Sequence, residues 1–419
     1  MAHPTFSLNT LRNLTQLLGP GVLMATAAIG GSHLVASTQA GAIYGWQLAL
    51  LVFIVNLLKY PFFRAGVSYT ISAGETLQTG YLRLGKGYLL TALLLNIISA
   101  VVNSAALLMF SASLLGYFMP MDISVPLLAA VILIAILVIL IGGHFAALEK
   151  ISKAIMITLV IATISATFIA WQNGAVAPDD YVSPSPWTMA AIGFLVVTMG
   201  WMPAPIEISG ITSLWLKKQC EEKAVTAKSA LFDFNLGYFT TMILALVFLA
   251  LGALVLHGSG EALASGGIGF SKQLVGLYAG TIGEWARWLI AVVAFLCIFG
   301  SALTVYDGYS RAVTEAILLL NGKKEMPERN VVLVLSLVAV LSFIIVLFFK
   351  AALLAMLGFA MTLAFITTPM FALLNHKLVR KAELHDSVKA GPFVTTLSYI
   401  GLAYLFGFLA IFIAWKWFI

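Results

Sequence analysis

Long apolar stretches separated by short polar segments run through almost the whole chain. A helix needs about 20 predominantly apolar residues to cross the hydrocarbon core of a bilayer. Eleven stretches reach that length, so the pattern predicts an all-α integral membrane protein with eleven transmembrane helices. The predicted spans lie near 15–44, 47–73, 88–118, 123–143, 146–172, 187–215, 230–256, 286–319, 330–349, 351–374 and 392–415.

Two of these stretches contain residues that interrupt a helix. The first holds two glycines, a serine and a histidine at 30–33, and the sixth holds glycine and two prolines within 200–205. Glycine costs roughly 1 kcal/mol in a helix interior, and irregular backbone at membrane depth is tolerated only where it is buried or lines a cavity. Two such breaks at corresponding places in two halves of a chain are typical of a transporter's substrate site.

The positions of the breaks also predict how the chain is organised. Spans one to five and six to ten each begin with an interrupted helix, which indicates two five-helix repeats of opposite orientation. We place the first repeat at 1–182, the second at 183–380 and an additional eleventh span at 381–419.

Lysine and arginine positions orient the helices, because positive residues gather in cytoplasmic loops. With the N-terminus in the cytoplasm, 18 of the 23 lie in or beside inward loops, and Lys59 falls within the second span. We therefore predict a plasma (inner) membrane protein with a cytoplasmic N-terminus and an outward C-terminus. The four remaining basic residues face outward: Lys272, Arg287, Lys350 and Lys416.

Composition narrows the class of protein further. Hydrophobic residues make up 61% of the chain and charged residues 10%, whereas a soluble chain has about 25% charged residues. The sequence shows no soluble domain and no glycine-rich nucleotide-binding loop, which disfavours an ATP-driven pump. We expect no enzyme activity, no cofactor, no nucleic-acid partner and no obligatory protein partner. The expected partners are the lipid bilayer and a small inorganic ion.

Several short motifs resemble the Nramp divalent-metal transporters. They are Gly19-Pro20-Gly21, the run from Gln39 to Gly45, Asn56-Leu57-Leu58 and Met202-Pro203. The hydropathy layout is similar over nearly the whole chain. The resemblance implies the leucine-transporter fold, with broken first and sixth helices and alternating access around a site at the membrane midplane.

The chain departs from that family at its metal-binding motifs. The family's Asp-Pro-Gly-Asn motif is replaced by Gly30 to His33, and its Met-Pro-His motif ends here in Ala204. The third span, around Asn103, lacks the family's acidic residues. Because a divalent cation needs oxygen or nitrogen ligands and charge compensation, we expect a divergent, non-metal branch without a transition-metal site.

The breaks themselves favour an anion. The N-terminal end of each second half-helix carries roughly +0.5 charge and free N–H groups. Bicarbonate is the leading candidate, because the resemblance links a non-metal branch of Nramp relatives with it. The expected substrate-binding residues are Gly30, Gly31, Ser32, His33, Trp201, Met202, Ala204 and Glu207.

Other interpretations remain open at this point. One is divalent-cation uptake at a rebuilt site of Met202, Glu207 and His33. Another is a sensor or scaffold that kept the fold without transporting. His33 is alternatively a structural residue bonded to a carbonyl, and Met202 an ordinary core residue.

Sodium is the expected coupling ion, because an anion entering a cell moves against a negative interior. In this fold the usual sodium site lies between the first broken helix and the eighth span. Ser301 and Thr304 are three residues apart and therefore share a helix face. Carbonyls near Thr26 and Ile29 would complete the shell, and Asp307 would add charge. The alternative is that these hydroxyls bond carbonyls of their own helix.

Ionisable residues inside spans are functional candidates by default. Lys59 lies deep in the second span and needs a partner, which Glu207 or Asp307 would supply. We expect these three residues to form a buried charge network, either as a structural ion pair or as a relay.

Overall fold

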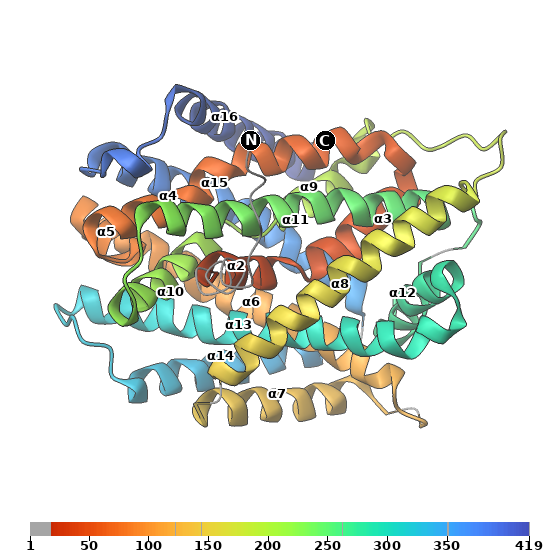
Figure 1. Ribbon diagram of the computed structural model, residues 1–419, viewed down its shortest axis with the longest axis horizontal. Helices are drawn as coiled ribbons and strands as arrows, with labels where there is room; N and C mark the ends of the chain where they lie inside the picture. The colour runs from red at the N-terminus through yellow and green to blue at the C-terminus, as the bar shows by residue number, and fades with distance from the viewer. Residues whose placement is uncertain (1–17, 122, 144, 262, 350–351, 419) are drawn as a thin grey trace, which may run out of the picture.

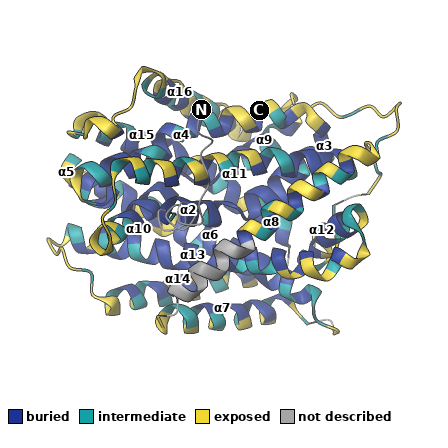
Figure 2. Cartoon of the chain, viewed as in Figure 1, coloured by how far each residue is buried: buried dark blue, intermediate teal, exposed yellow. Residues whose placement is uncertain are grey.

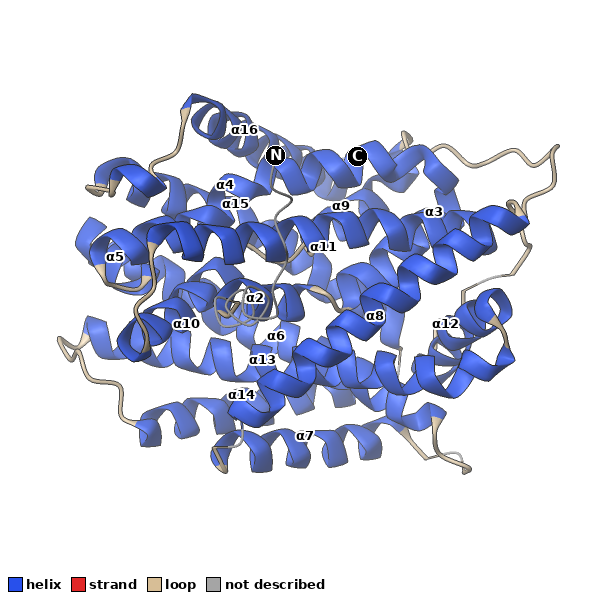
Figure 3. Ribbon diagram, in the orientation of Figure 1, coloured by secondary structure: helices blue, strands red, loops and turns tan. Residues whose placement is uncertain are grey.

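The computed structural model describes residues 18–121, 123–143, 145–261, 263–349 and 352–418, and over these the chain is helical without any strand (Figure 3). Apart from the two broken spans, the long helices are continuous. They are α4 (Ala49–Ala73), α6 (Lys86–Tyr117), α7 (Val125–Ile141), α8 (Phe145–Asn173), α11 (Ala227–Val255), α13 (Arg287–Leu320), α14 (Glu328–Phe349), α15 (Leu353–Lys381) and α16 (Pro392–Phe418).

The predicted all-helical membrane fold is confirmed, whereas the exact number of crossings stays a prediction. Eight helical segments of the described chain are long and apolar enough to cross a membrane, and two shorter apolar helices accompany them. One of the eight runs over 42 residues from Ser32 to Ala73. Within it the chain turns back at Gly45, where φ is +59°, so this run contains parts of the first and second predicted spans (Figure 1).

Both predicted breaks are present. The first span consists of α2 (Pro20–Ala28), a π-helical turn η1 (Ser32–Ser37) and α3 (Thr38–Tyr44). The sixth consists of α9 (Ile192–Gly200) and α10 (Ile208–Glu222), with irregular backbone between them. Proline lacks a backbone N–H donor and glycine loses more conformational entropy in a helix than other residues, which favours an interruption at both places.

The broken helices lie in the middle of the bundle. Figure 1 shows α2 near the centre with α10 to its left, α11 running above α2, α8 crossing diagonally beside it, and α7 and α14 along the lower edge. The long helices α6 and α13 pack against each other on the other side of the breaks. Figure 2 shows that buried residues surround the breaks, while exposed residues concentrate on the peripheral helices. The exposed apolar side chains there suit contact with lipid.

Glycines bring α11 into direct backbone contact with both halves of the first span. A Cβ on Gly237 would lie 2.2 Å from the Gly21 carbonyl oxygen, and one on Gly41 would lie 2.0 Å from the Leu249 carbonyl oxygen. The Asp233 carboxylate on α11 also accepts the backbone N–H groups of Gly19 and Gly21, at 3.1 and 2.7 Å. This carboxylate satisfies the start of α2, where free N–H groups favour negative charge.

Two helices in the connections were not among the predicted spans. They are the short α5 (Leu77–Leu84) and α12 (Gly267–Ile282), which lies between the seventh and eighth predicted spans. The predicted repeat boundaries fall between α8 and α9 and in the last turn of α15, and the inverted repeat stays a prediction.

Candidate functional site

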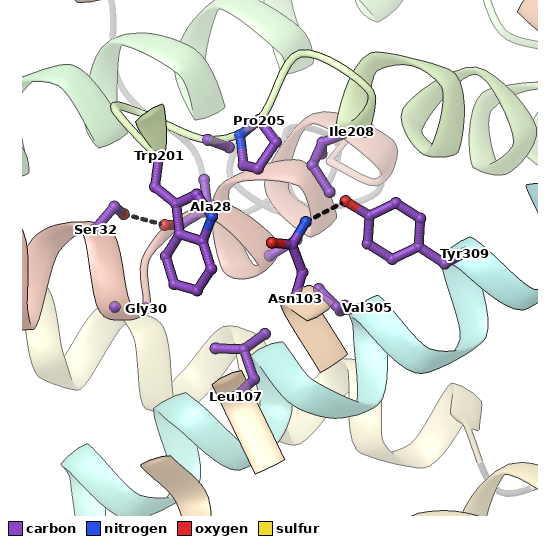
Figure 4. Close-up of a pocket in the computed structure, with 13 residues that line it drawn as sticks. Ala28, Gly30, Ser32, Asn103, Leu107, Trp201, Pro205, Ile208, Val305 and Tyr309 are labelled. Atoms are coloured by element: carbon purple, nitrogen blue, oxygen red, sulfur yellow. Dashed lines mark hydrogen bonds between the residues drawn. The ribbon is translucent and has the colours of Figure 1, made fainter. Parts of the chain in front are cut away.

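The two breaks face each other across a small cavity of about 30 Å³ (Figure 4). Apolar and small side chains make up most of its wall, and none of its lining residues is charged. Residues from α2, η1, α6, α10, α13 and the two breaks contribute. They are Ala27, Ala28, Gly30, Gly31, Ser32, Asn103, Leu107, Trp201, Ala204, Pro205, Ile208, Val305 and Tyr309.

The Trp201 side chain forms one wall of this cavity. Its ring lies against Gly31, where a Cβ would come within 2.6 Å of the indole Cζ3 atom, so the indole position requires glycine. The indole Nε1 is buried without a hydrogen-bond partner. Because buried donors are normally paired, this N–H is available to an acceptor in the cavity.

A chain of hydrogen bonds leads from the cavity to Glu207. The Asn103 amide Nδ2 donates to the Tyr309 hydroxyl at 2.8 Å (Figure 4), and that hydroxyl donates to Glu207 Oε1 at 3.2 Å. Glu207 itself does not line the cavity. The carboxylate therefore lies one residue behind the wall, and Tyr309 separates it from a bound ligand.

His33 does not reach the cavity. Its Nε2 faces the Thr241 carbonyl at 2.9 Å, and its Nδ1 faces the Ser32 hydroxyl at 2.7 Å. The Ser32 hydroxyl also donates to the Ala28 carbonyl at 2.7 Å. The wide π-helical turn directs the imidazole toward α11, so the prediction of a cavity-facing histidine is corrected, and the interpretation as a structural residue describes its position.

Met202 also lies outside the cavity. It is fully buried in a separate apolar cluster with side chains of α4, α9, α11 and α15. Of the predicted substrate residues, the cavity therefore contains Gly30, Gly31, Ser32, Trp201 and Ala204. Met202, Glu207 and His33 do not converge, and no group of three metal-ligating His, Cys, Asp or Glu side chains exists among the described residues.

The residues of the predicted sodium site lie between the first break and α13, and sodium binding there stays a prediction. Ser301 Oγ lies 2.8 Å from the Thr26 carbonyl oxygen and 3.2 Å from that of Ile29, so oxygens of the first break and α13 converge. Ser301 Oγ also lies 3.1 Å from the Cys297 carbonyl oxygen of its own helix, and the Thr304 hydroxyl donates only within that helix, to the Gly300 carbonyl at 2.7 Å. Asp307 forms an ion pair at 2.9 Å and is 11% exposed at its side chain, which corrects its expected place in the sodium shell.

The predicted charge network divides into two separate arrangements. Asp307 pairs with Arg311, which also contacts Glu328 at 3.0 Å. Lys59 is fully buried and donates to the carbonyls of Met199 and Gly200, at 2.8 and 3.2 Å. These are the last carbonyls of α9, where a helix carries partial negative charge. Lys59 therefore stabilises the end of a half-helix. Of its two expected partners, Glu207 interacts with the Lys59 charge through space, whereas Asp307 pairs with Arg311.

Sequence reasoning missed several cavity residues on α6, α10 and α13. Asn103 carried a usable signal, because an amide in an otherwise apolar span needs a partner inside the protein. Tyr309 carried a weaker one, since buried tyrosines are common and pair their hydroxyl groups wherever packing permits. The other missed residues are apolar, and nothing in the sequence distinguishes them from ordinary core residues: Leu107, Ile208 and Val305.

No known protein-family model matches the chain. The chain is 50% identical over 400 residues to the uncharacterised protein PM0681 of Pasteurella multocida, which covers 95% of this chain and 92% of that protein. It is 22% identical over 267 residues to the divalent metal cation transporter MntH of Staphylococcus saprophyticus. That alignment covers 61% of this chain and 60% of MntH.

Solved structures show the same fold at low sequence identity. A variant of the manganese transporter of Eremococcus coleocola superposes with a TM-score of 0.72 and 14% identity, over 99% of this chain and 88% of that one. The transporter MhsT with bound L-phenylalanine gives a TM-score of 0.63 and 13% identity, over 93% and 98%. The leucine-transporter fold predicted from sequence is thereby confirmed. By its identity over nearly its whole length, the chain belongs to the family that includes PM0681 of Pasteurella multocida, and it has the leucine-transporter fold.

Proposed function

We propose that this protein is a secondary active transporter that carries a small anion, with bicarbonate as the leading candidate, by symport with sodium. The fold is shared with solved transporters, and the cavity occupies the place where both broken helices meet. Such breaks at the midplane are where transporters of this architecture bind substrate. Alternating access would come from movement of the broken-helix bundle against α6 and α13.

The residues of the cavity wall favour an anion over a cation as the substrate. The Trp201 indole N–H is an unpartnered donor, and no lining residue bears a charge. A divalent cation placed there would lose its hydration without gaining a carboxylate. An anion would gain the indole N–H together with the positive ends of the second half-helices.

The oxygens around Ser301 support sodium as the coupling ion. Two backbone carbonyls, of Thr26 and Ile29, approach the Ser301 hydroxyl from the first break. Hard oxygen ligands of this kind suit an alkali or alkaline-earth cation. Because α2 ends within this group, occupation by sodium would fix the geometry of the first break and thereby favour binding in the cavity.

Divalent-metal uptake is the second candidate, and the names of two relatives favour it. Both MntH of Staphylococcus saprophyticus and the Eremococcus coleocola protein are called metal transporters. The positions of Met202, Glu207 and His33 count against it, because these three do not converge.

Uptake into proteoliposomes separates the two candidates. Labelled bicarbonate and labelled manganese would each be measured with and without an inward sodium gradient. The proposal predicts sodium-dependent bicarbonate uptake and no manganese signal above empty liposomes. Manganese uptake that is insensitive to sodium would overturn it and establish the second candidate.

A further inference from the structure

A buried carboxyl group beside the cavity has no role in the transport scheme above. Glu207 immediately precedes α10 and is 2% exposed. Its Oε1 accepts the Tyr309 hydroxyl, whereas its Oε2 is buried without a hydrogen-bond partner. The Ser99 hydroxyl on α6 and the Glu207 backbone N–H lie close enough to favour the ionised carboxyl group, but neither reaches Oε2 at hydrogen-bond geometry. Burying an ionised oxygen without a partner is costly, and a proton on that oxygen removes the charge.

The groups that face Glu207 leave Oε2 open to a proton. Lys59 on α4 attracts the carboxylate through space, but its hydrogen bonds go to the end of α9. Tyr309 on α13 and Tyr81 on α5 are the other titratable neighbours, and both bury their hydroxyl groups. We infer that Glu207 is a proton-binding site and that its proton is a second coupling ion of the transporter.

The hydroxyl group of Tyr309 connects this site to the cavity. It has a single proton, which it donates to Glu207 Oε1, and it also lines the cavity wall. An anion that accepts this proton withdraws the Tyr309 hydrogen bond from the carboxylate, which shifts Glu207 toward its protonated form. By linkage, a proton on Glu207 favours anion binding by the same factor. This coupling rests on the proposed function, whereas proton binding itself does not.

Polar side chains continue from Glu207 away from the cavity. The Asn375 amide on α15 donates to Ser209 Oγ at 2.8 Å and accepts from the Tyr81 hydroxyl. Ser209 lies at the start of α10, the half-helix that the predicted topology directs to the cytoplasm. The proton adds to Oε2 from water on that side, converts a carboxylate into a carboxylic acid, and returns to the same water when it leaves.

Infrared difference spectroscopy of the purified full-length protein in lipid tests the inference without any substrate. Between about pH 5 and pH 9, the protein should show a protonated-carboxyl C=O band that titrates. Glu207→Gln should remove this band. Asp307→Asn, which alters another buried carboxyl group of a span, should leave it unchanged. Tyr309→Phe should retain the band and move its midpoint upward by about one pH unit, because the carboxylate loses its donor.

The outcomes separate this inference from the proposed function. A Glu207-dependent band without sodium-driven bicarbonate uptake would leave proton binding intact and remove the anion assignment. Uptake without such a band would overturn the inference and leave the transporter assignment standing. If Glu207→Gln does not yield folded protein, an unchanged midpoint in Tyr309→Phe overturns the inference by itself.

Discussion

The first and the second break use their polar groups in opposite ways. In the first break, Ser32 and His33 are bonded to carbonyls, and the carbonyls of Thr26 and Ile29 face Ser301. In the second break, by contrast, the Trp201 indole N–H and one oxygen of Glu207 are buried without partners. The first break therefore supplies space and a candidate cation site, and the second supplies the groups that are free to respond to a ligand.

Replacing Lys59 should have the largest effect on the stability of the protein, because its side chain holds the end of α9 at the second break. Lys59→Met leaves the Met199 and Gly200 carbonyls without their donor, at a cost of roughly 1–3 kcal/mol for each buried group. We expect a lower melting temperature and less monodisperse protein in size-exclusion chromatography. Lys416→Met, at an exposed position, is the control. A melting temperature like that of the parent protein would show that α9 does not depend on Lys59.

Adding one methyl group at Gly31 tests whether the first break must leave room for the Trp201 ring beside the cavity. Gly31→Ala places a Cβ 2.6 Å from the Trp201 ring and must displace the indole, whereas a Cβ on Gly30 meets its nearest atom at 3.5 Å. We expect Gly31→Ala to raise the KM for uptake about tenfold or more, equivalent to at least ~1.4 kcal/mol. Gly30→Ala should change KM much less, and equal effects of the two would contradict the assigned contact.

The cation site of the first break predicts a sodium-specific change. Ser301→Ala removes the hydroxyl oxygen between Thr26 and Ile29 and should raise the sodium concentration for half-maximal uptake about tenfold. Thr304→Ala should have little effect, because the Thr304 hydroxyl bonds only the Gly300 carbonyl of its own helix, whereas Ser301 also meets two carbonyls of the first break. Sodium titration of uptake at fixed substrate measures both. A stronger effect of Thr304→Ala would restore it as a ligand.

The smallest effect should come from a single N–H group of the second break. Trp201→Phe keeps an aromatic ring against Gly31 and removes only the unpartnered donor, so KM should rise roughly fivefold, or about 1 kcal/mol. Trp215→Phe is a matched control, because its indole N–H is likewise buried and unpartnered but lies outside the cavity lining. If both substitutions change KM equally, the Trp201 N–H does not contact substrate.

The breaks were predictable, whereas the directions of their side chains were not. Clustered glycine and proline disfavour a helix, so the interruptions near Gly31 and Pro203 follow from local sequence, whereas the isolated Pro61 and Pro369 lie inside continuous helices. The π-helical turn after Gly31 widens the helix and directs His33 toward Thr241, and residue spacing assumed for an ordinary helix places it elsewhere. Likewise, the choice of Tyr309 as the neighbour of Glu207 depends on which helices pack together, which chain spacing does not specify.

The glycine contacts of α11 have a mechanical consequence. Where backbone touches backbone, as at Gly21 with Gly237 and at Gly41 with Leu249, two helices have no side chains that can slide or change rotamer between them. The two halves of the first span thus both pack directly against the backbone of one helix, α11, on either side of the break. A tilt of α2 alone would break these contacts. The first span and α11 should therefore move together as one rigid body, and the hinge should lie in the loops that connect α11 to its neighbours.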